Sequence, residues 1–437
     1  MPSSRRPQPP SLLRRACTAA LLAGAAVLLL ACGGGEDRSK AQVRLVNASV
    51  DHGALDLYDG ESRRVLASVG FGGNATYAEV DPDDADMDVT RAGSSTALAS
   101  TAPALSEGDR YSVVAYSNGS GLATVVVDDN AGTPDRGEAR VRVLNAAPDA
   151  GALDVYLTTA DADLADAEPL LANAAAGSLT ALVTTNATTW RLRVTAAGDR
   201  DDLRLDLPSL TLGSEQVVTV VLTPGAGGVL VDALVLVQRG EVSVQAGTAA
   251  RVRVVAGVTA SGAVAATVGG VTLMNGTGAP AAGAYRLVTA GASDATASVD
   301  GVAISVPAST LDAGKDYTLL VYGPAAAAQA AWIVDDNRLP TVSGRAKLRL
   351  VHGLADVSEA IALTLDFNPV ADGVASGTAS SPLQVNAVSA GALSVTAPGR
   401  GSPVWQAVDQ VLVSDGVYTL FVVGPEANAT GILRKDR

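Results

Sequence analysis

The chain consists of short segments in which apolar and polar residues alternate. Residues 140–143 read Arg-Val-Arg-Val, and a period of two places both valines on one face of a half-buried β-strand. Runs at 182–185 and 190–194 fit the same pattern. Gly, Asn, Asp and Pro separate these runs, as is typical of turns. No long amphipathic helix is evident after the N-terminal segment. The pattern predicts an all-β protein.

Four segments open with the same strand pattern around a central arginine. They cover residues 43–47, 141–145, 252–256 and 348–352. The central arginines are Arg44, Arg142, Arg253 and Arg349. Successive arginines are 98, 111 and 96 residues apart, a spacing that fits a whole small domain and is too long for a solenoid repeat.

Each repeat has a second shared strand near its end, preceded by a turn signal. These late strands cover residues 111–116, 217–222, 317–322 and 418–423. Repeats one and three also end alike, with Val-Asp-Asp-Asn at 127–130 and at 334–337. This likeness suggests two tandem pairs, one with two and three with four. Short strands separated by frequent turns predict an Ig-like antiparallel β-sandwich for each repeat.

We therefore predict tandem Ig-like antiparallel β-sandwich domains behind an export signal. The expected domains are residues 42–135, 136–245, 246–343 and 344–437. Before them we expect a lipoprotein signal peptide at residues 1–31 and a lipidated cysteine with a flexible tether at residues 32–41.

The N-terminal segment has the composition of a secretory signal. Four arginines without an acidic residue precede an apolar run from Ala16 to Ala31. Residues 29–32, Leu-Leu-Ala-Cys, resemble a bacterial lipobox, which implies cleavage before Cys32 and lipidation of that cysteine. Gly33, in the next position, is by the same resemblance typical of transfer to the outer membrane. We expect an exported protein, lipid-anchored in the cell envelope and facing either the periplasm or the outside.

Two alternatives for this segment stay open. Residues 16–35 are long enough to cross a bilayer as an uncleaved helix. Arg5 and Arg6 are also a feature of twin-arginine export, although the hydrophobic residues expected to follow that motif are missing.

The composition excludes several classes of function. The chain has 45 Asp and Glu against 31 Lys and Arg, a formal net charge of −14. A surface this acidic repels nucleic acid and anionic lipid headgroups, so we expect no nucleic-acid partner. The only cysteines are Cys17 and Cys32, so the body of the mature chain has no intrachain disulfide.

The repeat openings resemble a known bacterial family. Residues 141–156, Val-Arg-Val-Leu-Asn-Ala-Ala-Pro-Asp-Ala-Gly-Ala-Leu-Asp-Val-Tyr, are similar to the opening of the domain of unknown function 4397. Repeat one keeps Asn-Ala-Ser at 47–49 and Leu-Asp-Leu-Tyr at 55–58. Repeat four keeps His352 and has Ile361 in place of the second aspartate, and repeat three keeps only the strands. The resemblance implies an Ig-like envelope protein and no specific activity.

Pairs of aspartates at the repeat openings are the first candidate site residues. Asp51 with Asp56 and Asp149 with Asp154 are each five residues apart across a turn, where they could offer carboxylates to a cation. The favoured interpretation is structural. Asp149 follows a proline in a turn and would bond its own backbone, and Asp154 would face solvent from a strand.

Four other acidic segments could hold calcium. Residues 81–88 and 161–168 are dense in carboxylates, but they lack the glycine and terminal glutamate of an EF-hand loop. We favour exposed acidic loops for both. The paired aspartates at 128–129 and 335–336 lie at expected domain junctions, where calcium would stiffen the chain, and this alternative stays open.

The histidine count argues against common forms of catalysis. His52 and His352 are the only histidines and lie in different repeats, so no Ser-His-Asp or Cys-His arrangement forms within one repeat. His352 occupies the place of Asn47 and Asn145, which suggests a hydrogen-bonding role at a strand end. A glycosidase pair of carboxylates stays open. The single tryptophan in each of repeats two, three and four is expected in a core; they are Trp190, Trp332 and Trp405.

The sequence thus predicts a non-catalytic envelope lipoprotein that displays tandem Ig-like domains for binding, adhesion or scaffolding. We expect no catalytic residue, cofactor or metal site, and Cys32 as the one modified residue. The expected partners are the membrane, through the lipid on Cys32, and an unidentified protein or glycan. The alternatives are a secreted carboxylate-based hydrolase directed at glycans and a calcium-stiffened stalk. Partners could also add a strand to an exposed sheet edge.

Overall fold

The computed structural model describes residues 37–60, 62–73, 76–119 and 121–437. Within these ranges nearly all regular structure is β-strand, and the helical elements are four short 3-10 turns. These are η1 (Pro82–Asp84), η2 (Pro148–Ala150), η3 (Ala325–Ala327) and η4 (Glu426–Asn428). The expected signal peptide and Cys32 lie outside the described residues. No helix in the described ranges has the length and apolarity needed to span a bilayer.

Repeat one is a sandwich of two four-stranded sheets with the orders β4-β1-β7-β8 and β3-β2-β5-β6. Its strands are β1 (Ala41–Asn47), β2 (Leu55–Asp59), β3 (Arg63–Val69), β4 (Ala78–Val80), β5 (Met87–Arg91), β6 (Ala97–Thr101), β7 (Arg110–Asn118) and β8 (Gly121–Asp128). Leu45 from one sheet and Leu57 from the other are fully buried in the shared core.

Repeat two has the sheets β12-β9-β15-β16-β17 and β11-β10-β13-β14. Its strands are β9 (Glu138–Asn145), β10 (Leu153–Thr158), β11 (Leu171–Ala174), β12 (Val183–Asn186), β13 (Thr189–Ala196), β14 (Asp199–Thr211), β15 (Gln216–Pro224), β16 (Val231–Val237) and β17 (Val242–Gln245). Val143 and Leu192 meet in its core.

Repeat three is divided among three sheets, more than any other repeat. Its main sheets have the orders β21-β18-β27-β28, with β22 also paired to β18, and β20-β19-β24-β25, and β23 pairs with β26. The strands are β18 (Ala249–Val258), β19 (Ala263–Val268), β20 (Val271–Gly278), β21 (Ala281–Ala282), β22 (Arg286–Thr289), β23 (Gly291–Ala292), β24 (Ala295–Val299), β25 (Val302–Ile304), β26 (Thr310–Leu311), β27 (Asp316–Gly323) and β28 (Gln329–Asp335).

Repeat four returns to two four-stranded sheets, with the orders β32-β29-β35-β36 and β31-β30-β33-β34. Its strands are β29 (Arg345–Leu354), β30 (Ile361–Leu365), β31 (Asn368–Val374), β32 (Leu383–Asn386), β33 (Val388–Thr396), β34 (Trp405–Leu412), β35 (Val417–Gly424) and β36 (Thr430–Lys435). The predicted core role of the tryptophans is confirmed, because each packs against the apolar core of its own sandwich.

The predicted tandem Ig-like β-sandwich fold is confirmed, with one addition. In every repeat the opening strand pairs in parallel with the late strand: β1 with β7, β9 with β15, β18 with β27 and β29 with β35. The remaining pairings within the sheets are antiparallel. The opening and late strands run in the same direction because the chain visits the second sheet between them.

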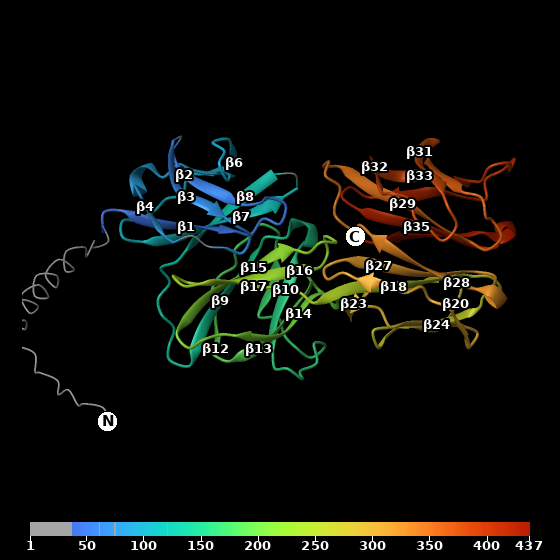
Figure 1. Cartoon of the computed structure of the whole chain (residues 1–437), viewed down its shortest axis with the longest axis horizontal. Helices are drawn as coiled ribbons and strands as arrows, with labels where there is room; N and C mark the ends of the chain where they lie inside the picture. Colours follow the sequence, from blue (N-terminus) through green and yellow to red (C-terminus); the bar gives the residue numbers. More distant parts are fainter. Residues whose placement is uncertain (1–36, 61, 74–75, 120) are drawn as a thin grey trace, which may run out of the picture.

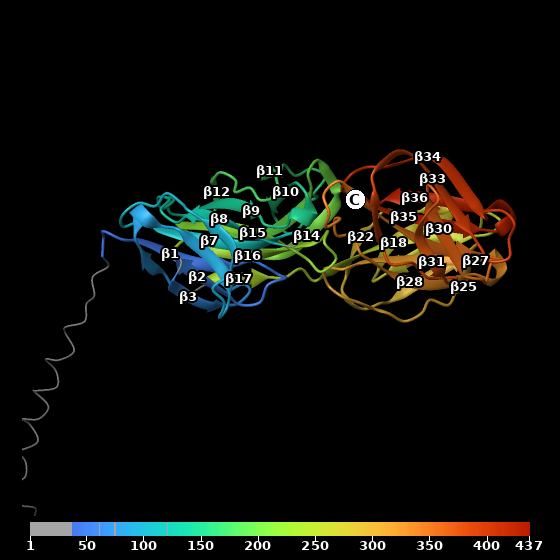
Figure 2. The same cartoon turned by 90° about the horizontal axis from the view of Figure 1, so that it is seen from above.

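The repeats are stacked in two pairs that lie end to end (Figure 1). Repeats one and two share an apolar cluster that includes Val46, Val114 and Val221. Repeats three and four share a second cluster around Val255, Leu320 and Phe421. In both pairs the sheet that carries the opening strand covers its counterpart. Figure 2 shows the two pairs side by side from above. The pairing suggested by the repeated Val-Asp-Asp-Asn segments is therefore confirmed.

Candidate functional site

The opening arginines lie between the two sandwiches of each pair. In β1, Val43 and Leu45 point into the core of repeat one, so the period of two turns Arg44 to the opposite face of the sheet. That face is covered by the partner repeat, and Arg44 is 1% exposed. The equivalent arginines are also buried; they are Arg142, Arg253 and Arg349.

Each of these arginines bonds a hydroxyl on the parallel late strand. The Arg44 Nε donates to Ser112 Oγ at 2.7 Å, and the Arg253 Nε donates to Thr318 Oγ1 at 2.9 Å. The other two pairs are Arg142 with Thr219 at 2.9 Å and Arg349 with Thr419 at 2.8 Å. The parallel register places each arginine directly beside its hydroxyl. A serine or threonine thus recurs at one position of the late strand because its hydroxyl bonds the opening arginine.

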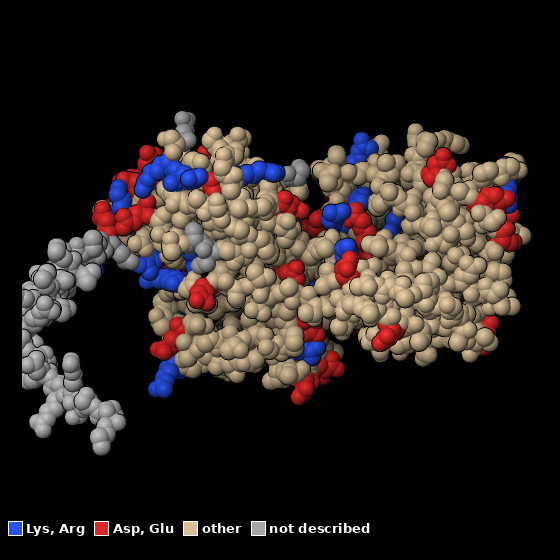
Figure 3. All heavy atoms as spheres, viewed as in Figure 1, with Lys and Arg blue, Asp and Glu red and all other residues tan. Residues whose placement is uncertain are grey.

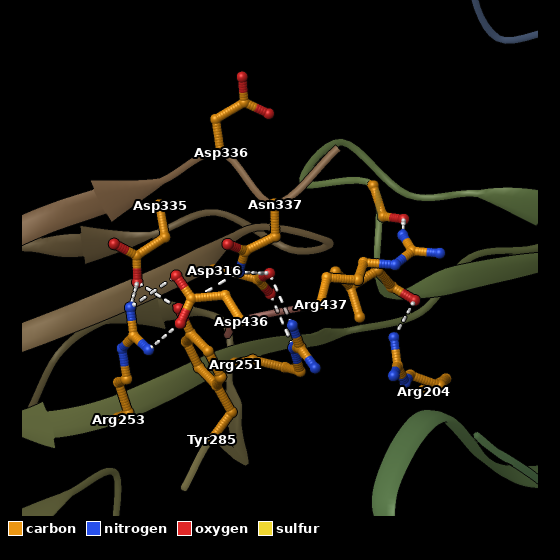
Figure 4. A network of polar contacts seen from close by, with 12 residues as sticks. Arg204, Arg251, Arg253, Tyr285, Asp316, Asp335, Asp336, Asn337, Asp436 and Arg437 are labelled. Carbon is orange, nitrogen blue, oxygen red and sulfur yellow. Dashed lines mark hydrogen bonds and ion pairs between the residues drawn. The ribbon is translucent and has the colours of Figure 1, made fainter. Parts of the chain in front are cut away.

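In the pair of repeats three and four, the arginines reach across to aspartates of the partner repeat. Arg253 of repeat three forms an ion pair with Asp436 of repeat four, and Arg349 of repeat four forms one with Asp335 of repeat three. Burial by itself would raise the pKa of Asp335, but Arg349 and Arg253 hold it below its usual range. The ionised carboxylate is compensated by two cations. These two ion pairs give the interface a buried, reciprocal network. Figure 4 shows the part of it around Arg253, Asp335 and Asp436.

The pair of repeats one and two has a weaker version of the same network. Arg44 donates to the main-chain oxygens of Gly240 and Val237, and Arg142 donates to the main-chain oxygen of Asp128 at 2.6 Å. In repeat two, Gln238 stands where the other repeats have the buried aspartate, and its Oε1 has no hydrogen-bond partner. Without a close carboxylate, burial lowers the pKa of Arg142.

A half-buried tyrosine completes the network in repeats one and three. The Tyr77 hydroxyl donates to Asp129 Oδ2, and the Tyr285 hydroxyl donates to Asp335 Oδ2, both at 2.7 Å. The guanidinium of Arg44 lies 5.1 Å from the Tyr77 ring centroid, and that of Arg253 lies 4.5 Å from the Tyr285 ring centroid. These are cation–π distances. Burial raises the pKa of both phenols, so both keep the proton that they donate.

The paired aspartates at the ends of repeats one and three serve different purposes. Asp129, the second of its pair, and Asp335, the first of its pair, take the buried position, because only alternate residues of a strand face the interface. Figure 4 shows Asp336 pointing away from the network, and it accepts from Lys347 instead. The buried aspartates thus bond arginine, tyrosine and hydroxyl donors, which is a structural use that the calcium hypothesis did not foresee.

The prediction that Asp154 faces solvent from its strand is wrong. Asp154 and its equivalent Asp56 are buried. Asp56 accepts the amides of Ser68 at 2.7 Å and Gly93 at 3.0 Å. Asp154 accepts those of Asn173 at 2.7 Å and Gly198 at 2.9 Å.

Ser68 and Asn173 each lie at a β-bulge, and each has a left-handed backbone, with φ of 55° and 54°. The carboxylates therefore stabilise two bulges that lack glycine. In repeats three and four, Ala265 and Ala362 take the place of the aspartate, and the bulge residue is a glycine, Gly276 or Gly373, with positive φ. Ala362, and not Ile361, is thus the equivalent of the aspartate in repeat four.

The other two aspartates of the repeat openings, Asp51 and Asp149, do not stabilise a bulge. Asp51 is exposed. The sequence predicts that Asp149 bonds the backbone of its own turn, and this prediction is wrong. The Asp149 Oδ1 accepts the amide of Leu339, in the segment between repeats three and four, at 3.2 Å. Burial raises the pKa of Asp149. Asp149 therefore belongs to the contact between the two pairs.

The two acidic loops are held by local bonds. Asp81 caps η1 by accepting the amide of Asp83, and it forms an ion pair with Lys40 at 2.6 Å. Asp163 accepts the amide of Ala165, and Glu168 lies 3.5 Å from Arg200. Within the described ranges, no three His, Cys, Asp or Glu side chains are grouped so as to hold a metal ion.

The hydrogen-bonding role predicted for the strand-end residues is confirmed. Asn47 and Asn145 each accept the amide two residues ahead and donate to two main-chain oxygens. His352 accepts the Leu354 amide at Nδ1, and its Nε2 lies 3.2 Å from the Glu359 oxygen. Burial lowers the pKa of His352. A neutral ring protonated at Nε2 satisfies both contacts. His52 is separate, with Nδ1 2.8 Å from Ser49 Oγ.

A polar cavity of about 300 Å³ lies where repeats two, three and four meet. Its lining includes Arg251, Tyr285, Lys435 and Asp201. Arg251 is already engaged, because it bonds both oxygens of Asp316 at 2.8 Å and lies 3.3 Å from Asp202 of repeat two. The cavity adjoins the ion-pair network (Figure 4), and its buried cations are neutralised by their neighbours.

Carboxyl groups suited to acid catalysis would have a raised pKa. Burial raises the pKa of Asp59, Asp149 and Asp232. Asp59 forms an ion pair with Arg63, and Asp232 accepts the amide of Gly247 at 2.6 Å. Each of the three is thus engaged by a separate structural partner.

The two pairs differ in charge. Residues 42–245 contain 13 Arg and Lys against 29 Asp and Glu, whereas residues 246–437 contain 12 against 14. Figure 3 shows charged side chains gathered on the first pair and at the junction, and a mostly uncharged face on the second pair. The net acidity of the protein therefore belongs to one half of it.

Comparison with known proteins places the repeats in a family. Residues 41–156 and 250–361 match “Domain of unknown function (DUF4397)”. None of the curated proteins compared with the chain matches it. A solved structure described as a “putative cell adhesion protein” from Bacteroides fragilis has 10% sequence identity, with 43% of this chain and 97% of that chain covered and a TM-score of 0.12. A likeness this remote carries no argument.

Proposed function

Because this chain belongs to the DUF4397 family, we propose that it is a non-catalytic lipoprotein of the cell envelope. It displays two rigid pairs of β-sandwich domains for binding, adhesion or scaffolding. The observation that carries the proposal is that the buried charged residues form contacts between repeats. The opening arginines and the aspartates they meet join one repeat to the next.

The geometry suits a display scaffold. An isolated domain pair on a flexible linker would move freely, but here polar contacts also join the two pairs. Gly227 of repeat two donates to the main-chain oxygen of Gly314 at 2.7 Å, and Arg437 of repeat four donates to that of Gly228 at 3.0 Å. These contacts support the proposal that the two pairs are displayed together to a partner.

The anchor is the second part of the proposal. Cys32 precedes β1 by nine positions in the sequence, and β1 belongs to the pair formed by repeats one and two (Figure 1). A lipid on Cys32 would therefore hold the acidic pair near the membrane and place the nearly neutral pair farther away. Lipid chains anchor in proportion to the methylenes they bury, about 0.8 kcal/mol each.

Cell fractionation with protease shaving of intact cells tests the anchor and the direction in which the protein faces. The native chain is compared with Cys32→Ser. We expect the native protein in the membrane fraction and Cys32→Ser in the soluble fraction. Native protein that protease removes faces outward, which favours adhesion, and protected protein favours periplasmic scaffolding. A Cys32→Ser protein that stays membrane-bound at full length would overturn the lipid anchor in favour of a transmembrane helix.

A binding role needs its own measurement. Cells carrying the native chain are compared with cells carrying Cys32→Ser for attachment to a surface and for integrity of the envelope in detergent. A loss of either property in the variant supports display at the membrane. Unchanged attachment and unchanged detergent resistance would contradict both adhesion and scaffolding.

A further inference from the structure

Repeat two differs from the other repeats by one additional strand. In every repeat the late strand pairs antiparallel with the strand that follows it. Among the described strands, that following strand forms the edge of its sheet in repeats one, three and four; these edges are β8, β28 and β36. In repeat two the chain turns back after β16 and covers the equivalent edge with β17. The protein thus contains its own example of a strand added at this position.

The strand β17 shows how an added strand fits the groove between two repeats. It runs antiparallel to β16, with Val242 opposite Leu236 and Val244 opposite Leu234. Residues directly opposite each other share a face of the sheet, so both valines face repeat one, as the two leucines do. Val242 packs against the apolar cluster between the repeats, and Val244 packs so closely against Gly72 of repeat one that a side chain there would overlap it. The groove therefore accepts a strand with small apolar residues at alternate positions.

A cavity of about 350 Å³ lies at the corresponding place beside β28. Its lining comes from the end of that strand, including Ile333 and Val334, and from residues 377–382 of repeat four. Ile333 is the equivalent of Leu236, because each lies opposite the threonine that bonds the opening arginine. Val334 is 61% exposed. The place that Val242 fills in repeat two is therefore open in repeat three.

Two alanines widen this groove relative to the groove beside β8. In the first pair, Leu179 and Val125 pack against the apolar cluster between the repeats. Their equivalents in the second pair are Ala379 and Ala331. The first equivalence follows from the isolated bridge that each residue forms with the opening strand, and the second from the pairing with the late strand. Smaller side chains at both places leave the room that the cavity occupies.

The edge of β36 differs from that of β28 by its charge. Arg434 and Lys435 are exposed at the end of β36, and cationic side chains discourage the addition of a further strand. In β28 the one charged residue is Asp335, which is buried and paired with Arg349. The seven residues of β28 also pair with β27 without a register shift, and none of them has positive φ. The strand β28 thus offers a regular edge beside an open cavity.

We propose that β28 binds an extended segment of a partner protein, which adds an antiparallel strand to it as β17 does to β16. A small apolar residue of that segment, opposite Ile333, enters the cavity, and a second one lies opposite Ala331. Asp336 is the one charged residue of the cavity lining and is engaged by Lys347, so an apolar side chain meets no unpaired charge there. The main chain of the partner supplies affinity, and its alternating small residues supply selectivity.

A peptide with the sequence of the added strand tests this proposal. The probe is a fluorescently labelled peptide of residues 240–248, which include β17, and its binding to the purified full chain in detergent is measured by fluorescence anisotropy. We expect saturable binding, and at least about a tenfold rise in the dissociation constant with Ala379→Leu, which restores the leucine of repeat two. The matched control is Ala303→Leu, the same substitution at an exposed position of β25, which should leave the dissociation constant unchanged. No binding at about 1 mM peptide, or an equal loss in both variants, would overturn the proposal.

The inference rests on the proposed function, because it names the kind of partner that the displayed domains bind. It does not depend on the lipid at Cys32, so the two can fail separately. Loss of the anchor in the fractionation experiment would leave peptide binding by the purified chain unchanged, and absence of peptide binding would leave the anchor unchanged.

Hydrogen exchange and a modified peptide test the site and the mode of binding. We expect the peptide to protect amides of residues 329–335 and 377–382. Protection confined to residues 231–237 would mean that the probe displaces β17 from β16, and would refute binding at β28. A peptide N-methylated at its central Val-Ser-Val keeps the side chains and loses main-chain donors, so it should bind at least about tenfold more weakly. Equal binding of the two peptides would contradict strand addition.

Sedimentation velocity without peptide distinguishes a second copy of this chain as the occupant. We expect the native chain and Ala379→Leu to sediment alike. A dimer that Ala379→Leu abolishes would show that the edge of β28 binds another copy, and would overturn the proposal of a different partner.

Discussion

Arg349 of repeat four and Asp335 of repeat three form an ion pair across a domain interface, with their side chains 4% and 0% exposed. Thr318 and Tyr285 donate to the same carboxylate. An ionised group this deeply buried is tolerated only because its neighbours replace water as partners. The interface between repeats three and four is therefore specific as well as apolar, since a shifted pairing would leave these charges unmatched.

Removal of the shared carboxylate should loosen this interface. We expect Asp335→Ala to lower the free energy of unfolding of the C-terminal pair by about 3–5 kcal/mol, because the variant leaves the buried Arg349 without its ion-pair partner. Denaturant unfolding measures the change. The control is Asp312→Asn, which breaks the exposed Lys315–Asp312 ion pair and should cost about 1 kcal/mol or less. Equal losses in both variants would show that burial of Asp335 adds nothing.

The role of the hydroxyl beside each opening arginine can be tested with a substitution that keeps the shape of the side chain. Thr318 Oγ1 accepts from Arg253 at 2.9 Å and donates to Asp335 at 2.6 Å. Thr318→Val removes both bonds and should lower the unfolding free energy by about 1–3 kcal/mol. Thr318→Ser should retain most of the stability, because repeat one has Ser112 at this position. A valine variant as stable as the serine variant would contradict this role of the hydroxyl.

The role of the bulge carboxylates can be tested with one variant that lowers stability and a second substitution that restores part of it. Asp154→Ala deprives the left-handed Asn173 of its partner, and we expect repeat two to lose about 1–3 kcal/mol of stability. The double variant Asp154→Ala, Asn173→Gly should regain part of this loss, since glycine adopts positive φ without strain. The variant then resembles repeats three and four. Thermal unfolding measures both effects, and an additive loss in the double variant would refute the explanation.

His352 should make repeat four sensitive to acid. Its pKa is lowered in the folded state because burial disfavours the imidazolium. Its contribution to stability is fully present above the unfolded pKa, about 6.5. As the pH falls below that value and through the folded pKa, the unfolded state binds the extra proton first. Stability should then decline by up to about 1.4 kcal/mol per pH unit.

His352→Asn is the matched variant for this test. Asparagine does the same work at Asn47 and Asn145, so the fold should tolerate it. The difference in denaturation midpoint between native and His352→Asn chains should depend on pH between about 7.5 and 5. A constant difference across this range would show that His352 does not titrate on unfolding.

The strand-end residues show where the sequence was sufficient to predict the structure, and the bulge aspartates show where it was not. His352 replaces asparagine at a fixed position of the repeat, and that substitution pattern alone predicted its hydrogen bonds. Asp154 was assigned to solvent because it follows an apolar residue in an alternating strand. Alternation identifies two faces, but it does not show that a bulge on the neighbouring strand brings amides to the outer one. The pairing of Asp with a non-glycine bulge residue, and of Ala with glycine, was a signal in the sequence that could have revealed it.

The arginines show the same limit at a larger scale. The sequence alone determined the all-β class, the repeats with their opening and late strands, and the pairing of repeats, because periodicity and repetition are local properties of the chain. It also marked four arginines as the most regular polar positions. Only the tertiary structure decided that these arginines are buried. A strand has two faces, and whether the polar one meets water or another domain depends on contacts between residues far apart in sequence. Arg253 and Asp436 are separated by 183 positions along the chain, and only folding brings them together.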